Sequence, residues 1–157
     1  VLEEFLEKLM KHPFVSAQPP KTTGREEFGE HFTRKVVGEM LRRGADPRDI
    51  IATLTEFTVR SIVYNYEKFV FPRYSDIAEV ILGGGGSFNK YIVRRLKELL
   101  EPQGIKVSTH EEYGIPSKFK EAIAMAILGS EALSGKSNNI PRVTEARRRV
   151  VMGKFIP

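Results

Sequence analysis

Four consecutive glycines, Gly83–Gly86, separate a short apolar run from an amphipathic segment, and this arrangement limits the possible folds more than any other part of the sequence. The run Ile77–Leu82 is β-branched and bounded by glycine, which predicts a central strand buried on both faces. Ser87 can cap a helix that stops at Gly104, and residues 105–108 follow as a second strand. A strand, a helix and a strand within about thirty residues predict a right-handed crossover and parallel pairing.

Four further helices are predicted from apolar residues that recur at helical spacing. The first stops near His12, because a residue before proline avoids the α region. A single helix spans residues 25–44 and ends in a glycine that suits a left-handed C-cap. Another begins at Asp46, which precedes a proline. The last begins near Ser117 and is expected to be buried on more than one side, and residues 150–152 are expected to add a short strand.

The composition excludes several classes of protein. The chain has 157 residues, 41% of them hydrophobic, and a net charge of +5, which suits one folded domain rather than a disordered chain. No stretch approaches the roughly 20 apolar residues of a membrane span. Cysteine is absent, which excludes disulfide and thiolate chemistry and fits a cytoplasmic setting, and the three histidines show no metal-ligand spacing. Basic residues alternate with acidic ones, so we expect a solvated surface rather than a nucleic-acid interface.

The glycine run has more than one interpretation. Its composition is that of a flexible linker, but the connection is too short to separate domains, which favours a structured turn. Glycines at the carboxyl end of a parallel strand let the backbone approach a ligand, and the next helix offers free N–H groups. This geometry suits a nucleotide, with the amide of Asn89 near a base or ribose. Tight helix–strand packing is the alternative. The segment matches neither the Walker A motif nor the dinucleotide fingerprint.

Two other segments combine residue types that bind ligands. Residues 19–26 join prolines, two cations and two hydroxyls, which can grip an anionic or polyol ligand. The alternative is a loop capped by Thr23, with Glu26 reaching back in a capping box. Glu121 falls in the first turn of a predicted helix, where its carboxylate is expected to be half-buried beside apolar side chains. Its alternative role is to complement the helix dipole.

Taken in order, these segments resemble one family, the anhydro-N-acetylmuramic acid kinases of bacterial cell-wall recycling. The most specific match is Pro19–Phe28, which is similar to the family signature Pro-Pro-Lys-Ser/Thr-Thr-Gly-Arg-Glu. Weaker matches follow in the family's order, namely Ile81–Asn89, Glu121-Ala122, Asn139–Pro141 and Val143-Thr144. The sequence departs from the family where Glu145 replaces the glycine of the common Thr-Gly-Ala. A bulky acid there can alter the nucleotide pocket and leaves the sugar specificity open.

The resemblance implies an α/β fold, the C-terminal lobe of an actin-like (ribonuclease H-like) ATPase, rich in helices and with a small, mainly parallel sheet. Residues 1–157 would be one domain of a two-lobed kinase, and the N-terminal lobe with its phosphate-binding loop and catalytic aspartate is absent from this sequence. The complete enzyme would use ATP and Mg²⁺ to phosphorylate 1,6-anhydro-N-acetylmuramic acid while water opens the anhydro ring. The product would be N-acetylmuramic acid 6-phosphate, and either lobe alone would be inert.

The resemblance also implies roles for individual residues. Glu121 would be catalytic, and Lys21 and Arg25 would bind the substrate. The residues expected to bind ATP are Gly83, Gly84, Gly85, Gly86 and Asn89. The expected partners are the sugar, ATP, the missing lobe and, as one option, a second copy in a homodimer, with neither nucleic acid nor a membrane. The alternative function is a non-catalytic nucleotide-binding or regulatory module, and nucleic-acid binding through paired arginines is a third.

Overall fold

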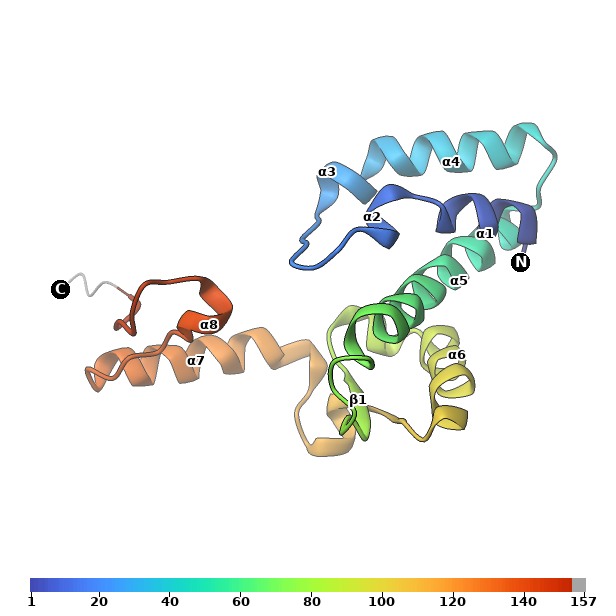
Figure 1. Cartoon of the computed structure of the whole chain (residues 1–157). Helices are drawn as coiled ribbons and strands as arrows, with labels where there is room; N and C mark the ends of the chain where they lie inside the picture. The colour runs from blue at the N-terminus through green and yellow to red at the C-terminus, as the bar shows by residue number, and fades with distance from the viewer. Residues whose placement is uncertain (154–157) are drawn as a thin grey trace. The chain divides into compact units, whose positions relative to one another are not determined.

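Helices make up most of residues 1–153, the part of the chain that the computed structural model describes (Figure 1). Contacts divide the chain into two units. Unit 1 comprises Val1–Leu82 and Gly86–Ser108, and unit 2 comprises Gly83–Gly85 and the chain from Thr109 onward. The expectation that residues 1–157 form one lobe of a larger fold stays a prediction.

Residues 1–109 contain six α-helices and both strands. The helices are α1 (Glu3–Met10), α2 (Pro13–Ser16), α3 (Arg25–Phe28), α4 (Glu30–Arg42), α5 (Pro47–Asn65) and α6 (Lys90–Leu100). Shorter helical turns are η1 (Tyr66–Val70), η2 (Gly85–Phe88) and η3 (Glu101–Gln103), and the strands are β1 (Glu79–Leu82) and β2 (Lys106–Thr109). The later elements are η4 (His110–Tyr113), η5 (Ser117–Phe119), α7 (Lys120–Leu133) and α8 (Pro141–Thr144).

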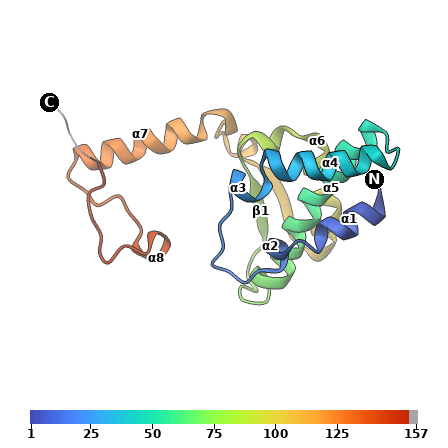
Figure 2. The same cartoon turned by 90° about the horizontal axis from the view of Figure 1, so that it is seen from above.

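The first core of unit 1 joins α1, α4 and the first half of α5, which lie together in Figure 2. Its buried side chains are Phe5, Leu6, Leu9, Val15, Met40, Ile50 and Phe57. The helix α5 begins as predicted: Pro47 takes the first helical position, and the side chain of Asp46 accepts a hydrogen bond of 2.7 Å from the backbone N–H of Arg48.

The second core packs the later half of α5 and the apolar face of α6 against the sheet. Its buried side chains are Val59, Val63, Val80, Leu96, Leu100, Ile105 and Val107. The strands pair in parallel, and Gly104 ends the helical segment in the left-handed conformation with φ of 81°. The predicted fold class, a helix-rich α/β chain with a small parallel sheet, is therefore confirmed. The helix α5 contributes to both cores and connects them.

Three predictions about local structure in this region are wrong. The strand β1 is not buried on both faces, because Val80 is buried whereas the next residue, Ile81, is 46% exposed. The predicted helix 25–44 is interrupted at Gly29, whose extended backbone ends α3 and precedes α4. The side chain that caps α6 belongs to Asn89, because Ser87 lies inside η2.

Unit 2 corrects two further predictions. The helix α7 has no buried residue among those described, and Met125 and Leu133 are each 68% exposed. Apolar side chains lie on all sides of α7, and the other described residues of unit 2 do not cover enough of its surface to bury any of them. Residues 150–152 form no strand in the described structure. Their backbone is held instead by side chains, since Val150 N–H donates to Asn139 Oδ1 at 2.7 Å. Over residues 1–153, no helix is both long and apolar enough to cross a membrane.

The second core is testable through Leu96, which is fully buried at the centre of α6. We expect Leu96→Ala to lower the free energy of unfolding of unit 1 by about 2–5 kcal/mol, since the substitution leaves a cavity. Urea denaturation followed by circular dichroism measures this loss. The matched control is Ile51→Ala, because Ile51 is 66% exposed on α5 and should change stability by less than about 0.5 kcal/mol. Equal losses in the two variants would contradict this description of the core.

Candidate functional site

The glycine turn, Gly83–Gly86, follows β1 and leads into η2. A β-carbon on Gly83 would overlap the imidazole of His110, and Gly84 has a φ of 85°, so both positions need glycine for structural reasons. A β-carbon on Gly85 or Gly86 would meet no atom of the described residues within 4 Å. Packing at Gly83 and backbone conformation at Gly84 therefore explain two of the four glycines, and the backbone of the other two is open to a ligand.

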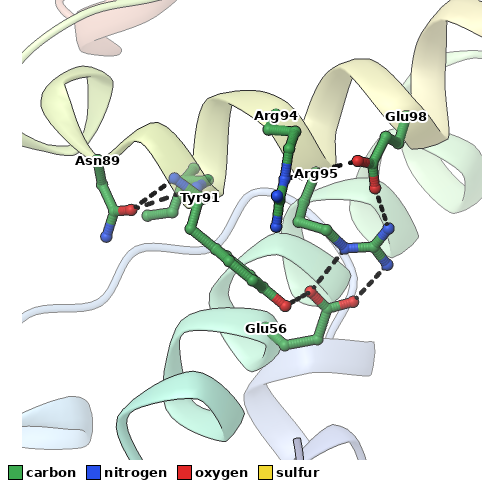
Figure 3. Close-up of polar contacts among 7 residues, drawn as sticks. Glu56, Asn89, Tyr91, Arg94, Arg95 and Glu98 are labelled. Atoms are coloured by element: carbon green, nitrogen blue, oxygen red, sulfur yellow. Dashed lines mark hydrogen bonds and ion pairs between the residues drawn. The ribbon is translucent and has the colours of Figure 1, made fainter. Parts of the chain in front are cut away.

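Asn89 links the glycine turn to α6. Its Oδ1 atom accepts hydrogen bonds from the backbone N–H groups of Tyr91 at 3.0 Å and Ile92 at 3.3 Å (Figure 3). This is the ordinary chemistry of an N-cap residue. Within residues 1–153 the Nδ2 group of Asn89 has no hydrogen-bond partner. The side chain can thus cap the helix and still donate to a ligand.

An ion pair between a buried carboxylate and a partly exposed guanidinium holds α6 against α5 (Figure 3). Glu56, on α5, is 4% exposed, and its carboxylate accepts hydrogen bonds from Arg95 Nη2 at 2.8 Å and Arg95 Nε at 3.0 Å. The hydroxyl of Tyr91 donates to the same carboxylate at 3.0 Å. Arg95 also pairs with Glu98 at 2.6 Å. We call Glu56, Tyr91 and Arg95 the α5–α6 clamp, and it fixes the helix that Asn89 caps.

Glu56 and Arg95 of the clamp are both ionised at neutral pH. Hydrogen bonds from Arg95 lower the pKa of the Glu56 carboxyl although burial opposes them, and the same contacts raise the pKa of Arg95. Burial, together with the bond to Glu56, raises the pKa of Tyr91. This cluster cannot be predicted from local sequence patterns, because Glu56 and Arg95 are 39 positions apart. The one local indication is that Glu56 lies on the buried face of α5. A carboxylate buried there is unfavourable unless a cation or a hydrogen-bond donor contacts it.

Lys21 lies in the wall of a cavity of about 560 Å³ in unit 1. Its Nζ atom donates to the carbonyl oxygens of Phe14 at 2.9 Å and Val15 at 3.0 Å. The same atom lies 4.9 Å from the ring centroid of Phe14 and 5.3 Å from that of Phe69. Burial lowers the pKa of the ammonium group. The predicted substrate residue therefore supports its own loop and also faces a cavity.

Arg25, the second predicted substrate residue, begins α3 and is exposed. The capping box expected beside it is wrong, because Gly24 takes the N-cap position of α3 and no side chain caps this helix in the described structure. A capping box occurs instead at the start of η4, where Thr109 N–H donates to Glu112 Oε1 at 2.8 Å. Helix capping thus does not explain the hydroxyls and cations of residues 19–26.

Glu121 falls in the first turn of α7, as predicted. Its side chain is exposed rather than half-buried, because the apolar residues around it on α7 are themselves exposed. The predicted site residues are thus divided between the units: Lys21, Arg25, Gly86 and Asn89 belong to unit 1, and Gly83–Gly85 and Glu121 belong to unit 2.

Glu145 adopts a backbone conformation that favours glycine. It ends α8 with a φ of 57°, and it is the only non-glycine residue with positive φ among those described. A side chain in this left-handed region costs roughly 1 kcal/mol. The glycine that the family resemblance implies at this position would adopt the same conformation without this cost.

Comparison with known proteins relates the chain to kinases. The family model described as anhydro-N-acetylmuramic acid kinase matches residues 1–157. Three curated proteins with this same name are similar over 155 residues, which is 99% of this chain. They come from Caldanaerobacter subterraneus subsp. tengcongensis (47% identical, 38% of its length), Bacillus cereus strain G9842 (43%, 40% of its length) and Francisella tularensis subsp. novicida (40%, 39% of its length).

The chain therefore belongs to the anhydro-N-acetylmuramic acid kinase family, and the predicted resemblance is confirmed. It spans about two fifths of the length of these relatives. Within residues 1–153, no group of three or more His, Cys, Asp or Glu side chains could hold a metal ion.

The α5–α6 clamp predicts a stability that depends on pH. Because the pKa of Glu56 is depressed in the folded state, its contribution is complete above the ordinary glutamate pKa and is lost as the pH falls through the lowered value. We expect Glu56→Gln to lower the free energy of unfolding by about 2–4 kcal/mol at pH 7, and the difference from wild type to narrow below about pH 4. Urea denaturation at both pH values measures it.

The control for this experiment is Glu30→Gln, which breaks an exposed ion pair with Arg34. An exposed pair within one helix contributes only about 0.3–0.5 kcal/mol. Equal effects of the two substitutions, or a Glu56→Gln effect that is the same at both pH values, would show that the clamp does not stabilise the fold through its charge.

Proposed function

We propose that residues 1–157 are the ATP-binding, C-terminal part of a kinase that phosphorylates 1,6-anhydro-N-acetylmuramic acid. Water would open the anhydro ring in the same reaction, and the product would be N-acetylmuramic acid 6-phosphate. The supporting observation is the family match over the full length of the chain. The remaining part of the kinase would supply the phosphate-binding loop and the catalytic aspartate, so the 157-residue chain should bind nucleotide weakly and catalyse nothing.

The glycine turn is the proposed binding site for the adenosine part of ATP, and we call it the nucleotide seat. Support comes from the open backbone at Gly85 and Gly86, the unused donor of Asn89 and the clamp that holds α6. Phosphoryl transfer depends mainly on positioning and charge stabilisation, so a rigid nucleotide seat contributes to the rate without taking part in bond changes. Mg²⁺ is expected to accompany ATP, because it neutralises charge on the phosphates during phosphoryl transfer.

Glu121 is the proposed catalytic residue on this part of the chain. An exposed carboxylate in the first turn of α7 is available to orient the sugar or the water that attacks it. Lys21 and Arg25 are proposed to bind the sugar. The alternative, a non-catalytic regulatory module, would keep nucleotide affinity but give no turnover when residues 1–157 are part of the whole kinase.

The nucleotide seat is tested by adding one methyl group at positions where the fold has room for it. Gly85→Ala and Gly86→Ala place a β-carbon in open space, so neither should disturb the fold, yet each should weaken ATP binding at least about tenfold by blocking the approach to the backbone. Calorimetric titration of ATP into the chain gives the affinity. Gly129→Ala on α7 is the control, because its β-carbon also meets open space. Equal ATP affinity in all three variants would exclude the glycine turn as the seat.

The role of Glu121 is tested in the whole kinase that contains residues 1–157. Glu121→Gln should reduce sugar-dependent ADP release about a hundredfold or more and leave the melting temperature unchanged, because an exposed side chain contributes little to stability. Glu131→Gln on the same helix serves as the control, since Glu131 pairs only with the exposed Lys136 at 3.6 Å. Unchanged turnover in Glu121→Gln would remove this residue from the mechanism.

A further inference from the structure

The imidazole ring of His110 packs directly against Gly83 in the glycine turn. A β-carbon on Gly83 would overlap the Cε1, Nδ1 and Nε2 atoms of this ring. The backbone of Gly83 does not itself require glycine, because its φ is not positive, in contrast to the φ of 85° at Gly84. The ring therefore excludes a side chain at position 83. Gly83 and His110 both belong to unit 2.

The Nδ1 atom of His110 makes no hydrogen bond. Within residues 1–153 it is the one buried side-chain nitrogen or oxygen atom that lacks a partner. Buried polar atoms nearly always have a partner, because leaving one unpaired is unfavourable. The ring is thus held against Gly83 by packing and not by a hydrogen bond at Nδ1. The stability of its own surroundings does not explain this arrangement, whereas a need to fix the glycine turn does.

The backbone of His110 is held on both sides by the hydrogen bonds of η4. Before it, the Thr109 N–H group donates to Glu112 Oε1 at 2.8 Å as part of the capping box. After it, the Ile115 N–H group donates to the His110 carbonyl oxygen at 3.0 Å, and Gly114 ends η4 with a left-handed φ of 70°. A ring on a backbone with so little freedom can keep a neighbouring glycine in place.

The η4 turn is also joined to the start of η5. The carboxylate of Glu111 accepts hydrogen bonds from the Ser117 N–H group at 2.8 Å and from Ser117 Oγ at 3.0 Å. The backbone bond from Ser117 lowers the pKa of the Glu111 carboxyl, because it favours the ionised form. The turn that carries His110 is therefore held by contacts that do not involve the glycine turn.

Gly83 and His110 directly follow the two paired strands, since β1 ends at Leu82 and β2 ends at Thr109. Ligands of open α/β sheets bind beyond the carboxyl ends of the strands. We propose that His110 is a positioning residue of the nucleotide seat, whose ring holds Gly83, and with it the start of the glycine turn, in the position that ATP binds. The inference rests on the proposed function, and His110 acts through Gly83 without touching the nucleotide.

Holding Gly83 in place favours binding because glycine has more conformational freedom to lose than any other residue. Each backbone residue that becomes ordered only on binding lowers the affinity roughly 5–30-fold. A turn of four consecutive glycines is exposed to this loss at several positions. The ring of His110 removes part of it, because Gly83 is already ordered before ATP arrives.

The test measures KM for ATP and kcat in the whole kinase that contains residues 1–157. We expect His110→Ala to raise KM for ATP roughly 5–30-fold and to leave kcat within about twofold of wild type, because the turn loses order while the reacting atoms keep their contacts. Gly83→Ala should raise KM as well, since its β-carbon displaces the ring or the turn. His31→Ala is the matched control, because His31 is an exposed histidine on α4 and should affect neither constant.

The double variant Gly83→Ala/His110→Ala identifies the contact itself. Removal of the ring makes room for the new methyl group, so the double variant should have a lower KM for ATP than either single variant. The comparison is Gly84→Ala combined with His110→Ala, because the strain at position 84 comes from its φ and does not depend on the ring. In that pair the two increases in KM should multiply.

An unchanged KM in His110→Ala, or a double variant whose KM is not below that of both single variants, would overturn the inference. Should His110→Ala fail to fold, His110→Leu decides. Its apolar side chain keeps the contact with Gly83 and carries no unpaired nitrogen, so its KM for ATP must stay within about threefold of wild type, and a larger increase overturns the inference.

Gly85→Ala in the same assay separates this inference from the proposed function. If Gly85→Ala raises KM for ATP and His110→Ala does not, only the positioning role is refuted. An unchanged KM in Gly85→Ala refutes the nucleotide seat, and the role of His110 with it.

Discussion

The ion pair between the buried carboxylate of Glu56 and the partly exposed Arg95 is the interaction on which the arrangement of unit 1 depends. The helix α5 carries both apolar cores, and the clamp attaches α6 to this helix at one fixed angular position. Apolar packing alone does not specify such a position, because hydrophobic side chains tolerate sliding and rotation. A bidentate guanidinium–carboxylate contact does, since both of its hydrogen bonds break when either helix turns. The glycine turn precedes α6, so the helix that follows it has an orientation set by this ion pair.

Features with short-range causes could be predicted from the sequence. The start of α5 at Asp46 and Pro47, the stop at Gly104 and the strand–helix–strand order all follow from capping chemistry and periodicity, and the structure agrees with them. Errors arose where two local signals competed. Ser87 and Asn89 are both capable caps, and only the extra turn of η2 decides between them. The predicted burial of α7 is too high, because the apolar residues of a helix do not reveal which other parts of the protein pack against them.

The candidate site was predictable in its residues and unpredictable in its environment. The segments from residue 19 onward, taken in order, identify the family, and the most specific of them contains Lys21. The sequence gives no sign that this lysine is placed between two backbone carbonyls and two phenyl rings, because Phe69 is far from it along the chain. The surroundings of Lys21 become visible only in the structure, where the side chain is partly buried and its ammonium group donates to two backbone carbonyls.

The left-handed conformation of Glu145 has a consequence for the stability of the turn after α8. This conformation favours glycine, so replacing Glu145 by glycine would relieve strain in the folded turn and also give the unfolded chain more conformational freedom. The two effects oppose each other, so the net change in stability would be smaller than either effect alone.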